Sequence, residues 1–211
     1  MQGSLITFEG IDGSGKSTQI QMLEHEFNKL GVEYKTFREP GGTELSEKIR
    51  AILLDKENFE LTSIAESLLF AASRAQLTTE KVKPAIAKGE FVICDRFTDS
   101  TIAYQGYGRG LDIKILEEIN HIATAGLTPD ITFILDINPE VSAARMDAKS
   151  PDRMEATGVD FFMRIRKGYH QIKDQNPHRY RIIDGEQPPE NVFKEIKEIL
   201  TKQFEEVLTC S

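Results

Sequence analysis

Hydrophobic residues recur along this chain in two patterns, short continuous runs and longer stretches with an apolar residue every three or four positions. Short runs are typical of strands buried in a parallel sheet, and the wider spacing predicts amphipathic helices. The runs predict strands at 5–8, 32–38, 91–94, 130–137 and 180–183. Helical spacing fills the intervals, at 17–30, 45–53, 62–88, 100–104, 113–125, 139–148, 161–175 and 191–207.

The alternation of these strands and helices predicts an α/β fold. We expect one domain over residues 1–211, a doubly wound, five-stranded parallel sheet with helices on both faces and ligands at the carboxyl ends of the strands. Gly31 is expected to end the first helix, Thr43 to cap the second, and Pro84 to bend or split the third. The polar, turn-rich segment 149–158 predicts a small mobile lid.

Composition and charge narrow the class of protein. A hydrophobic content of 39% with 28% charged residues is typical of a globular protein. The formal charge of −8 argues against a nucleic-acid or membrane surface. No apolar run is long enough to cross a membrane, and no signal peptide precedes the first strand, so we expect a cytoplasmic protein. Cys94 lies in a predicted strand and Cys210 near the end, which predicts reduced thiols.

The first predicted strand leads into a glycine-rich loop that opens the first helix. Gly10, Gly15, Lys16 and Ser17 fit the spacing G-x-x-x-x-G-K-[ST] of the P-loop. In such a loop the backbone N–H groups turn inward around an anion, and the helix adds the positive end of its dipole. The alternative is a glycine-rich turn that binds nothing. Because a strand precedes the motif and a helix follows it, we expect a nucleoside triphosphate site with bound Mg²⁺.

A second polar group follows the buried run at 91–94. Asp95 there is expected to position Mg²⁺, and the adjacent Arg96 to bridge donor and acceptor phosphates. The alternative for Asp95 is a capping or structural role. Further arginines occur at Arg38, Arg50, Arg74, Arg109 and Arg153, mostly in segments expected at the same edge of the sheet. A basic second site favours a kinase with a small acceptor, although any single arginine could be a solvated charge.

Five segments in this order resemble thymidylate kinases: FEGIDGSGKST from Phe8, REPGGT at 38–43, FAASRAQ at 70–76, CDRFTDSTIAYQG at 94–106 and PDRME at 151–155. The resemblance covers nearly the whole chain. It implies a P-loop kinase that transfers the γ-phosphoryl group of ATP to dTMP, with Mg²⁺, and that forms a homodimer. Two alternatives stay open, another nucleoside or nucleotide kinase and a P-loop switch or ATPase, although no N-K-x-D guanine signature is present.

The resemblance also implies roles for individual residues on the donor side. Lys16 and the loop amides would hold the ATP phosphates, Ser17 and Asp95 would hold Mg²⁺, and Arg96 would flank the transferred group. The loop carries no arginine, so the catalytic arginine of the lid is assigned to Arg153, as in the bacterial type. The full set expected to bind ATP is Gly10, Ile11, Asp12, Gly13, Ser14, Gly15, Lys16, Ser17, Thr18 and Arg145, with the loop at 185–188 as a further adenine contact.

On the acceptor side the resemblance implies a nucleotide pocket. Phe70 would stack on thymine, Arg74 would donate to its O4, and Gln105 with Ser100 or Thr101 would complete the base edge. From the residues alone, core packing is the simpler reading of Phe70 and of Tyr104. The remaining members of the implied set are Asp12 at the sugar 3′-hydroxyl, Tyr104 at C2′, Arg50 and Arg96 at the phosphate, Pro40 at the thymine methyl group, and Glu39.

Overall fold

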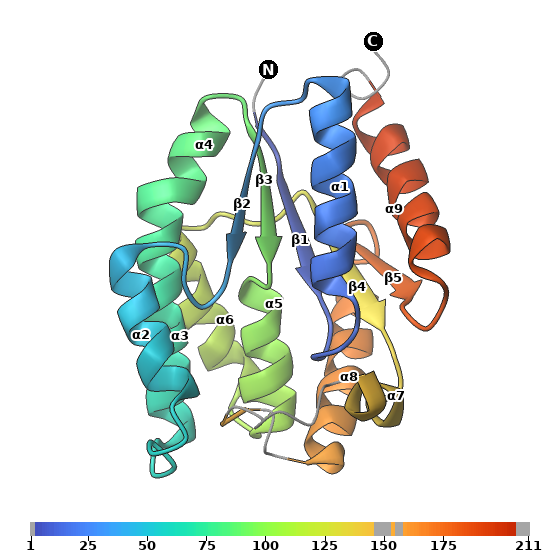
Figure 1. Cartoon of the computed structure of the whole chain (residues 1–211). Coiled ribbons are helices and arrows are strands. Elements are labelled where there is room, and N and C mark those ends of the chain that lie inside the picture. Colours follow the sequence, from blue (N-terminus) through green and yellow to red (C-terminus); the bar gives the residue numbers. More distant parts are fainter. Residues whose placement is uncertain (1–2, 146–152, 155–157, 206–211) are drawn as a thin grey trace.

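The computed structural model describes residues 3–145, 153–154 and 158–205. A five-stranded, fully parallel sheet runs through the middle of the molecule in the order β2-β3-β1-β4-β5 (Figure 1). All five predicted strands are present. Their bounds are β1 Leu5–Glu9, β2 Tyr34–Arg38, β3 Phe91–Asp95, β4 Ile131–Asp136 and β5 Tyr180–Asp184.

Helical segments connect the strands as the sequence pattern predicts. The bounds are α1 Lys16–Leu30, α2 Glu44–Leu54, α3 Ser63–Leu77, η1 Thr78–Val82, α4 Lys83–Ala87, α5 Thr98–Thr101, η2 Ile102–Gly108, α6 Ile113–Thr124, α7 Pro139–Arg145, α8 Val159–Gln175 and α9 Pro189–Gln203. Within the described residues, no helix combines the length and the apolar content that crossing a membrane requires.

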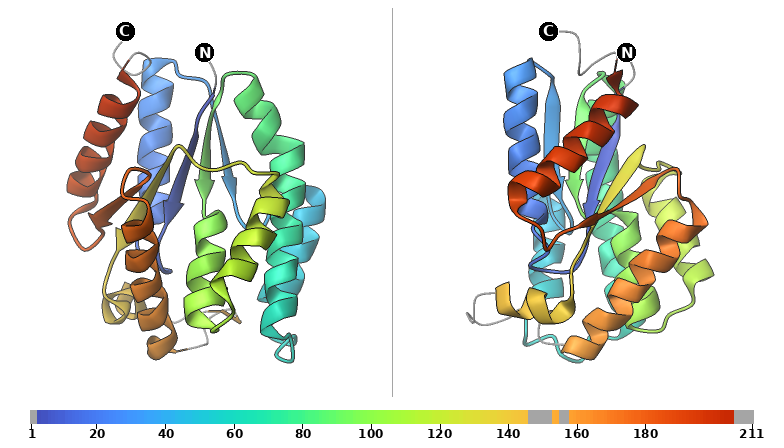
Figure 2. Two further views of the ribbon diagram at one scale, coloured as in Figure 1. Left: turned by 180° about the vertical axis from the view of Figure 1, so that it is seen from behind. Right: turned by 90° about the vertical axis from the view of Figure 1, so that its right-hand side faces the viewer.

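The sheet is covered on both faces, which explains its continuous apolar strands. Helices α1 and α9 lie on one face, and α3, α6 and α8 lie on the other (Figure 2). Successive residues of β3 point to opposite faces of the sheet. Ile93 packs with Phe27 of α1, whereas Val92 packs with Leu77 of α3. The expected doubly wound α/β fold is therefore confirmed.

Two of the predicted boundary signals are present in the structure. Gly31 ends α1 with a φ of 66°, in the left-handed region that glycine adopts without a Cβ clash. The Thr43 hydroxyl caps α2 by accepting from the Ser46 N–H at 3.1 Å. The cap fixes the start of the helix that carries Arg50.

The predicted helix at 62–88 is in fact three segments. A π-helical stretch, η1, separates α3 from α4, and Pro84 lies in the first turn of α4. Proline has no N–H and cannot donate to the carbonyl four residues earlier, so the regular ladder is interrupted here. The prediction at 100–104 was also too short, because α5 continues into η2. Helix α7 is described only to Arg145, and of the lid at 149–158 only 153–154 and 158 lie within the described residues.

Candidate active site

The glycine-rich loop between β1 and α1 has the backbone that the motif predicts. Gly10, Gly13 and Gly15 have φ values of 136°, 73° and 95°, all in the region that favours glycine. A Cβ on Gly10 would lie 2.5 Å from the carbonyl oxygen of Leu135, so β4 packs directly against the loop. The turn therefore requires glycine both for its dihedral angles and for the close approach of two backbones.

Lys16 is folded over this loop. Its Nζ donates to the carbonyl oxygens of Gly10 and Ile11, both at 3.1 Å. Burial lowers the pKa of Lys16, with a further lowering from Arg96, while nearby carboxylates including Asp95 oppose the change. A phosphate group would supply the anionic partner that two neutral carbonyls do not.

Ser17 and Asp95 offer oxygen ligands suited to Mg²⁺. The Ser17 hydroxyl lies 3.5 Å from Oδ2 of Asp95, and Oδ1 of Asp95 is buried without a hydrogen-bond partner among the described residues. A cluster of three or more His, Cys, Asp or Glu side chains that could hold a metal does not occur in the described part of the chain. Because Mg²⁺ typically takes one or two protein ligands plus substrate phosphates and water, the donor set fits.

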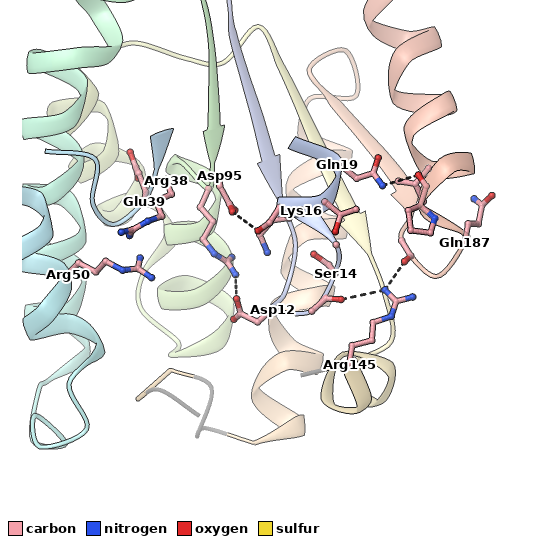
Figure 3. Close-up of a pocket in the computed structure, with 18 residues that line it drawn as sticks. Asp12, Ser14, Lys16, Gln19, Arg38, Glu39, Arg50, Asp95, Arg145 and Gln187 are labelled. Carbon is pink, nitrogen blue, oxygen red and sulfur yellow. Dashed lines mark hydrogen bonds and ion pairs between the residues drawn. The ribbon is translucent and has the colours of Figure 1, made fainter. Parts of the chain in front are cut away.

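These groups line a cavity of about 610 Å³ at the carboxyl ends of β1 and β3 (Figure 3). Residues 12–19 line it along one side, and Arg145 lines it at the end beside α7. Arg145 donates to the carbonyl oxygens of Gly185 at 2.9 Å and Gly13 at 3.4 Å. Gly185, Gln187 and Pro189 continue the wall beside Arg145, so the predicted adenine contacts at 145 and 185–188 lie together.

Two members of the predicted ATP set do not line this cavity. Ile11 is only 2% exposed and packs in the core beneath η2 and α8, and it presents only its carbonyl to Lys16. Gly10 likewise contributes its carbonyl oxygen, which accepts from both Lys16 and Arg96. The motif places the two residues next to the phosphates in sequence, but the turn directs Ile11 inward.

A second cavity, of about 100 Å³, adjoins the first. It shares four lining residues with the larger cavity, which are Asp12, Glu39, Arg50 and Arg96. All of the residues predicted to contact the acceptor line it, together with Leu54 and Met154: Asp12, Glu39, Pro40, Arg50, Phe70, Arg74, Arg96, Ser100, Thr101, Tyr104 and Gln105. The sequence motifs thus converge in space on one pocket beside the P-loop.

Arg96 lies at the junction of the two cavities. Its guanidinium bonds Asp12 at 2.7 Å and the Gly10 carbonyl at 3.0 Å, and it stacks on the Tyr104 ring at 4.9 Å. Burial alone would raise the pKa of Asp12, but Arg96 and then Lys16 hold that pKa below its usual value. Arg96 also has a φ of 70°, an uncommon conformation for a residue with a side chain.

Glu9, at the end of β1, holds this strained turn from beneath. It is fully buried and accepts from the N–H of Phe97 at 2.8 Å and from the hydroxyls of Ser100 at 2.5 Å and Tyr169 at 2.9 Å. Burial raises the pKa of Glu9, and Asp99 raises it further. Phe97 directly follows Arg96, so the carboxylate fixes the backbone that aims the guanidinium.

Arg74 is buried under the acceptor cavity with most of its donors used. Nε donates to Glu39 at 2.7 Å, Nη1 to Thr101 and Asn120 at 2.8 and 2.7 Å, and Nη2 to the Phe97 carbonyl at 2.9 Å. Burial raises the pKa of Glu39 to about 7 despite this pairing. The network fixes the position of Arg74 at the cavity wall.

Of the described lid residues, Met154 lines the acceptor cavity, and Arg153 packs beside it against α3. Arg153 pairs with Glu66 of α3 at 2.7 Å and donates to the Leu53 carbonyl at 2.8 Å, and Met154 lines the cavity. Arg153 lines neither the phosphate cavity nor the acceptor cavity. In this structure the predicted catalytic arginine therefore lies on the acceptor side, and its assignment to the transferred phosphoryl group stays a prediction.

Sequence reasoning missed Glu66, Leu54, Met154 and Tyr169. A signal was available for Glu66, since it stands on the same helical face as Phe70 and Arg74 at spacings of four and eight. A carboxylate on a buried face needs partners, and its partners come from segments far away in sequence. Tyr169, Leu54 and Met154 carry no such local signal.

Comparison with known proteins agrees with this geometry. The family model described as thymidylate kinase matches residues 8–196. The chain belongs to the thymidylate kinase family. Two curated relatives named thymidylate kinase are similar over almost their whole length: that of Chlorobium phaeobacteroides is 47% identical, covering 94% of this chain and 95% of the relative, and that of Thermoanaerobacter sp. is 46% identical, covering 96% and 99%.

A solved structure of a thymidylate kinase is also similar to this chain. The crystal structure of thymidylate kinase from Ehrlichia chaffeensis aligns with a TM-score of 0.79 and 36% sequence identity, covering 95% of this chain and 100% of that one. The matches confirm the resemblance drawn from the motifs, the P-loop kinase fold, and the assignment to the nucleoside monophosphate kinases.

Proposed function

We propose that this chain transfers the γ-phosphoryl group of ATP to dTMP and releases ADP and dTDP. The observation that carries the proposal is the joining of the two cavities: the P-loop cavity and the acceptor cavity share Asp12, Glu39, Arg50 and Arg96. A donor phosphate bound on one side and an acceptor phosphate on the other would thus meet at two arginines. Holding both reactants in line is the main requirement of phosphoryl transfer.

On the donor side, Lys16 and the N–H groups of the P-loop hold the β- and γ-phosphates. The dipole of α1 points its positive end at them. Arg145 lies over the loop at 185–188 and covers the adenine end of the cavity. Ser17 and Asp95 would hold Mg²⁺, which would neutralise the charge that develops on the phosphates.

On the acceptor side, Arg50 and Arg96 bind the dTMP phosphate and direct one of its oxygens at the donor. That oxygen is already anionic at neutral pH, so the reaction needs no general base. Arg96 neutralises charge on the transferred group, and closure of the lid would bring Arg153 to its other side and exclude water. Asp12, kept ionised by Arg96, accepts the sugar 3′-hydroxyl.

Recognition of the nucleoside follows from the remaining wall of the acceptor cavity. Phe70 stacks on thymine, Arg74 donates to its O4, Pro40 contacts the methyl group, and Tyr104 leaves little room for a 2′-hydroxyl. Glu39 acts through Arg74, while Ser100, Thr101 and Gln105 complete the polar edge. A pocket of fixed, buried hydrogen-bonding groups rejects ligands that leave those groups unpaired.

The experiment that tests the proposal is an assay of ADP release with ATP and Mg²⁺ and one acceptor at a time. The acceptors are dTMP, dUMP, UMP, CMP, AMP and thymidine, beside a reaction without acceptor. We expect dTMP to give the highest kcat/KM. A preference for another acceptor would overturn the substrate assignment, and hydrolysis that no acceptor changes would place the chain among P-loop switches or ATPases.

We propose further that the chain forms a homodimer through α2, α3 and α6. Helix α3 packs against both of the others, and together they carry most of the large apolar side chains that are exposed in the described part of the chain. These residues are Leu45, Ile52, Ile64, Leu68, Ile115 and Ile122. Light scattering should report a dimer for the native chain and a monomer for Leu68→Glu, while Met163→Glu on α8 should remain dimeric. A monomeric native chain would overturn this assignment.

A further inference from the structure

Glu66 is a buried carboxylate of α3 with three partners from two segments. It is 1% exposed. Its Oε1 accepts from Nε2 of Gln105 at 2.9 Å and from Nε of Arg109 at 3.4 Å, and its Oε2 accepts from Nη2 of Arg109 at 3.4 Å and Nη1 of Arg153 at 2.7 Å. Both oxygens therefore face N–H donors, and a carboxylate paired with two arginines offers them only acceptor atoms.

The carboxylate of Glu66 decides which way the Gln105 side chain is turned. A glutamine amide can present either its NH₂ or its oxygen to a neighbour, but only the NH₂ can bond to a carboxylate. Nε2 of Gln105 is therefore held against Glu66, and Oε1 takes the opposite edge of the amide. No described residue donates to this Oε1. Gln105 lines the acceptor cavity. Its side-chain oxygen can therefore accept a hydrogen bond from a ligand bound there.

Arg74 supplies the complementary group in the same cavity. A guanidinium has five N–H donors, and four of them are used by Glu39, Thr101, Asn120 and the Phe97 carbonyl. One N–H of Nη2 has no partner in the described part of the chain. The cavity thus offers one donor, from Arg74, and one acceptor, from Gln105.

This pair of groups fits one class of base edge. A pyrimidine with a 4-oxo group and a protonated N3 presents an acceptor and a donor. Cytosine presents a 4-amino donor and an N3 lone pair, so both of its groups would meet the wrong partner. Unpaired or opposed polar groups in a buried site reduce transition-state binding strongly.

We propose that Glu66 is a specificity-determining residue that acts through Gln105. By fixing the amide with its oxygen toward the base, Glu66 makes the enzyme select a 4-oxo, N3-protonated pyrimidine nucleotide over a cytosine nucleotide. The proposal rests on the proposed function, since it concerns the acceptor of the same reaction. Glu66 touches no substrate here and is a positioning residue.

The test is the ratio of kcat/KM for dTMP to kcat/KM for dCMP. In Glu66→Gln the new amide can donate to Gln105, which frees Gln105 to turn its NH₂ toward the base. We expect the ratio to fall about tenfold or more. In Glu66→Asp, which still only accepts, the ratio should stay near the native value even if both efficiencies fall. An unchanged ratio in Glu66→Gln would overturn the proposal.

A double-mutant cycle separates orientation of Gln105 from loss of the two arginine contacts. Gln105→Met removes the acceptor and leaves the buried charge in place, so the ratio should fall in this variant too. In the Gln105→Met background, Glu66→Gln should change the ratio no further. A further, equally large fall of the ratio in the double variant would overturn the proposal. So would an unchanged ratio in Gln105→Met alone. That single variant provides a test even if Glu66→Gln does not fold.

Arg109→Met is the matched control. It removes one cation from Glu66 without touching Gln105, and the ratio should stay within about twofold of the native value. The proposed function fails separately from this inference: in that case the native chain would not phosphorylate dTMP at all, and no ratio could be formed.

Discussion

The donor cavity and the acceptor cavity lie side by side but are built differently. The donor cavity is lined by the unbroken stretch 12–19, whose backbone N–H groups at the start of α1 are the proposed phosphate contacts. The acceptor cavity collects side chains from segments between Asp12 and Met154. A backbone cradle depends on a few glycine dihedral angles. The acceptor wall depends instead on buried charges, namely Glu9, Glu39, Glu66 and Arg74, each held by partners from distant segments.

This difference predicts which substitutions affect one property of the enzyme and which affect several. A change on the donor side should lower the rate with every acceptor alike. A change among the buried charges should alter acceptor choice, pH dependence or stability, because each charge has several partners that would be left unpaired. Substitutions at four residues test that division, and the largest effect is expected at Arg153.

Arg153 is expected to serve the donor phosphate, yet it lies on the acceptor side. If lid closure carries it to the transferred group, Arg153→Ala should lower kcat by about 10³- to 10⁵-fold, because an arginine that neutralises the transition state contributes that much. Steady-state kinetics with dTMP measures the change. If only the KM for dTMP rises, the catalytic assignment is wrong, and Arg153 supports the acceptor site through Glu66. Arg109→Ala, which removes the neighbouring partner of Glu66, is the control.

Lys16 belongs wholly to the donor side. Lys16→Met should lower kcat by roughly 10³-fold, since one preorganised cation at the reacting phosphates is lost. The loss should be the same factor for dTMP and dUMP. Calorimetric binding of dTMP without ATP should be within about threefold of the native affinity. A changed acceptor preference would contradict the division between the two cavities.

Glu39 tests the buried charges through pH. Its pKa is raised from 4.5 to about 7 in the folded state, so above pH 4.5 the unfolded chain releases a proton that the folded chain retains. Stability from this group is therefore full below pH 4.5 and declines as the pH rises through about 7. Relative to the native chain, Glu39→Gln should gain roughly 3 kcal/mol in free energy of unfolding between pH 4.5 and 8. Urea denaturation at the two pH values measures this difference, and a constant difference would contradict the assignment.

Thr43 should give the smallest effect. Thr43→Ala removes the cap of α2, which should cost about 1 kcal/mol of stability, measured by urea denaturation. Because α2 carries Arg50 to the acceptor cavity, the KM for dTMP should rise about two- to threefold while the KM for ATP stays the same. Thr43→Ser keeps the hydroxyl and serves as the control. Equal changes in both KM values would mean that the helix start supports both cavities.

Much of this architecture could be read from the pattern of apolar residues. The five strands and the P-loop were predicted because buried parallel strands are continuous apolar runs and the loop is a local motif. The order of the strands was not predicted, since it depends on which apolar faces pack together. Pro84 indicated a break in the third predicted helix, but the π-helical segment η1 that interrupts it was not predicted.

The sequence by itself determined the parallel α/β fold, the phosphate-binding loop and, through motifs spread over the chain, the kinase family. Each is set by residues close together in the chain or by their types. Only the tertiary structure decided which charges are buried and with which partners: Glu9 beneath the Arg96 turn, Glu39 on Arg74, and Glu66 between Gln105 and Arg153. Burial and pairing arise from contacts between distant segments, and they turn an ordinary carboxylate into a group that orients its neighbours.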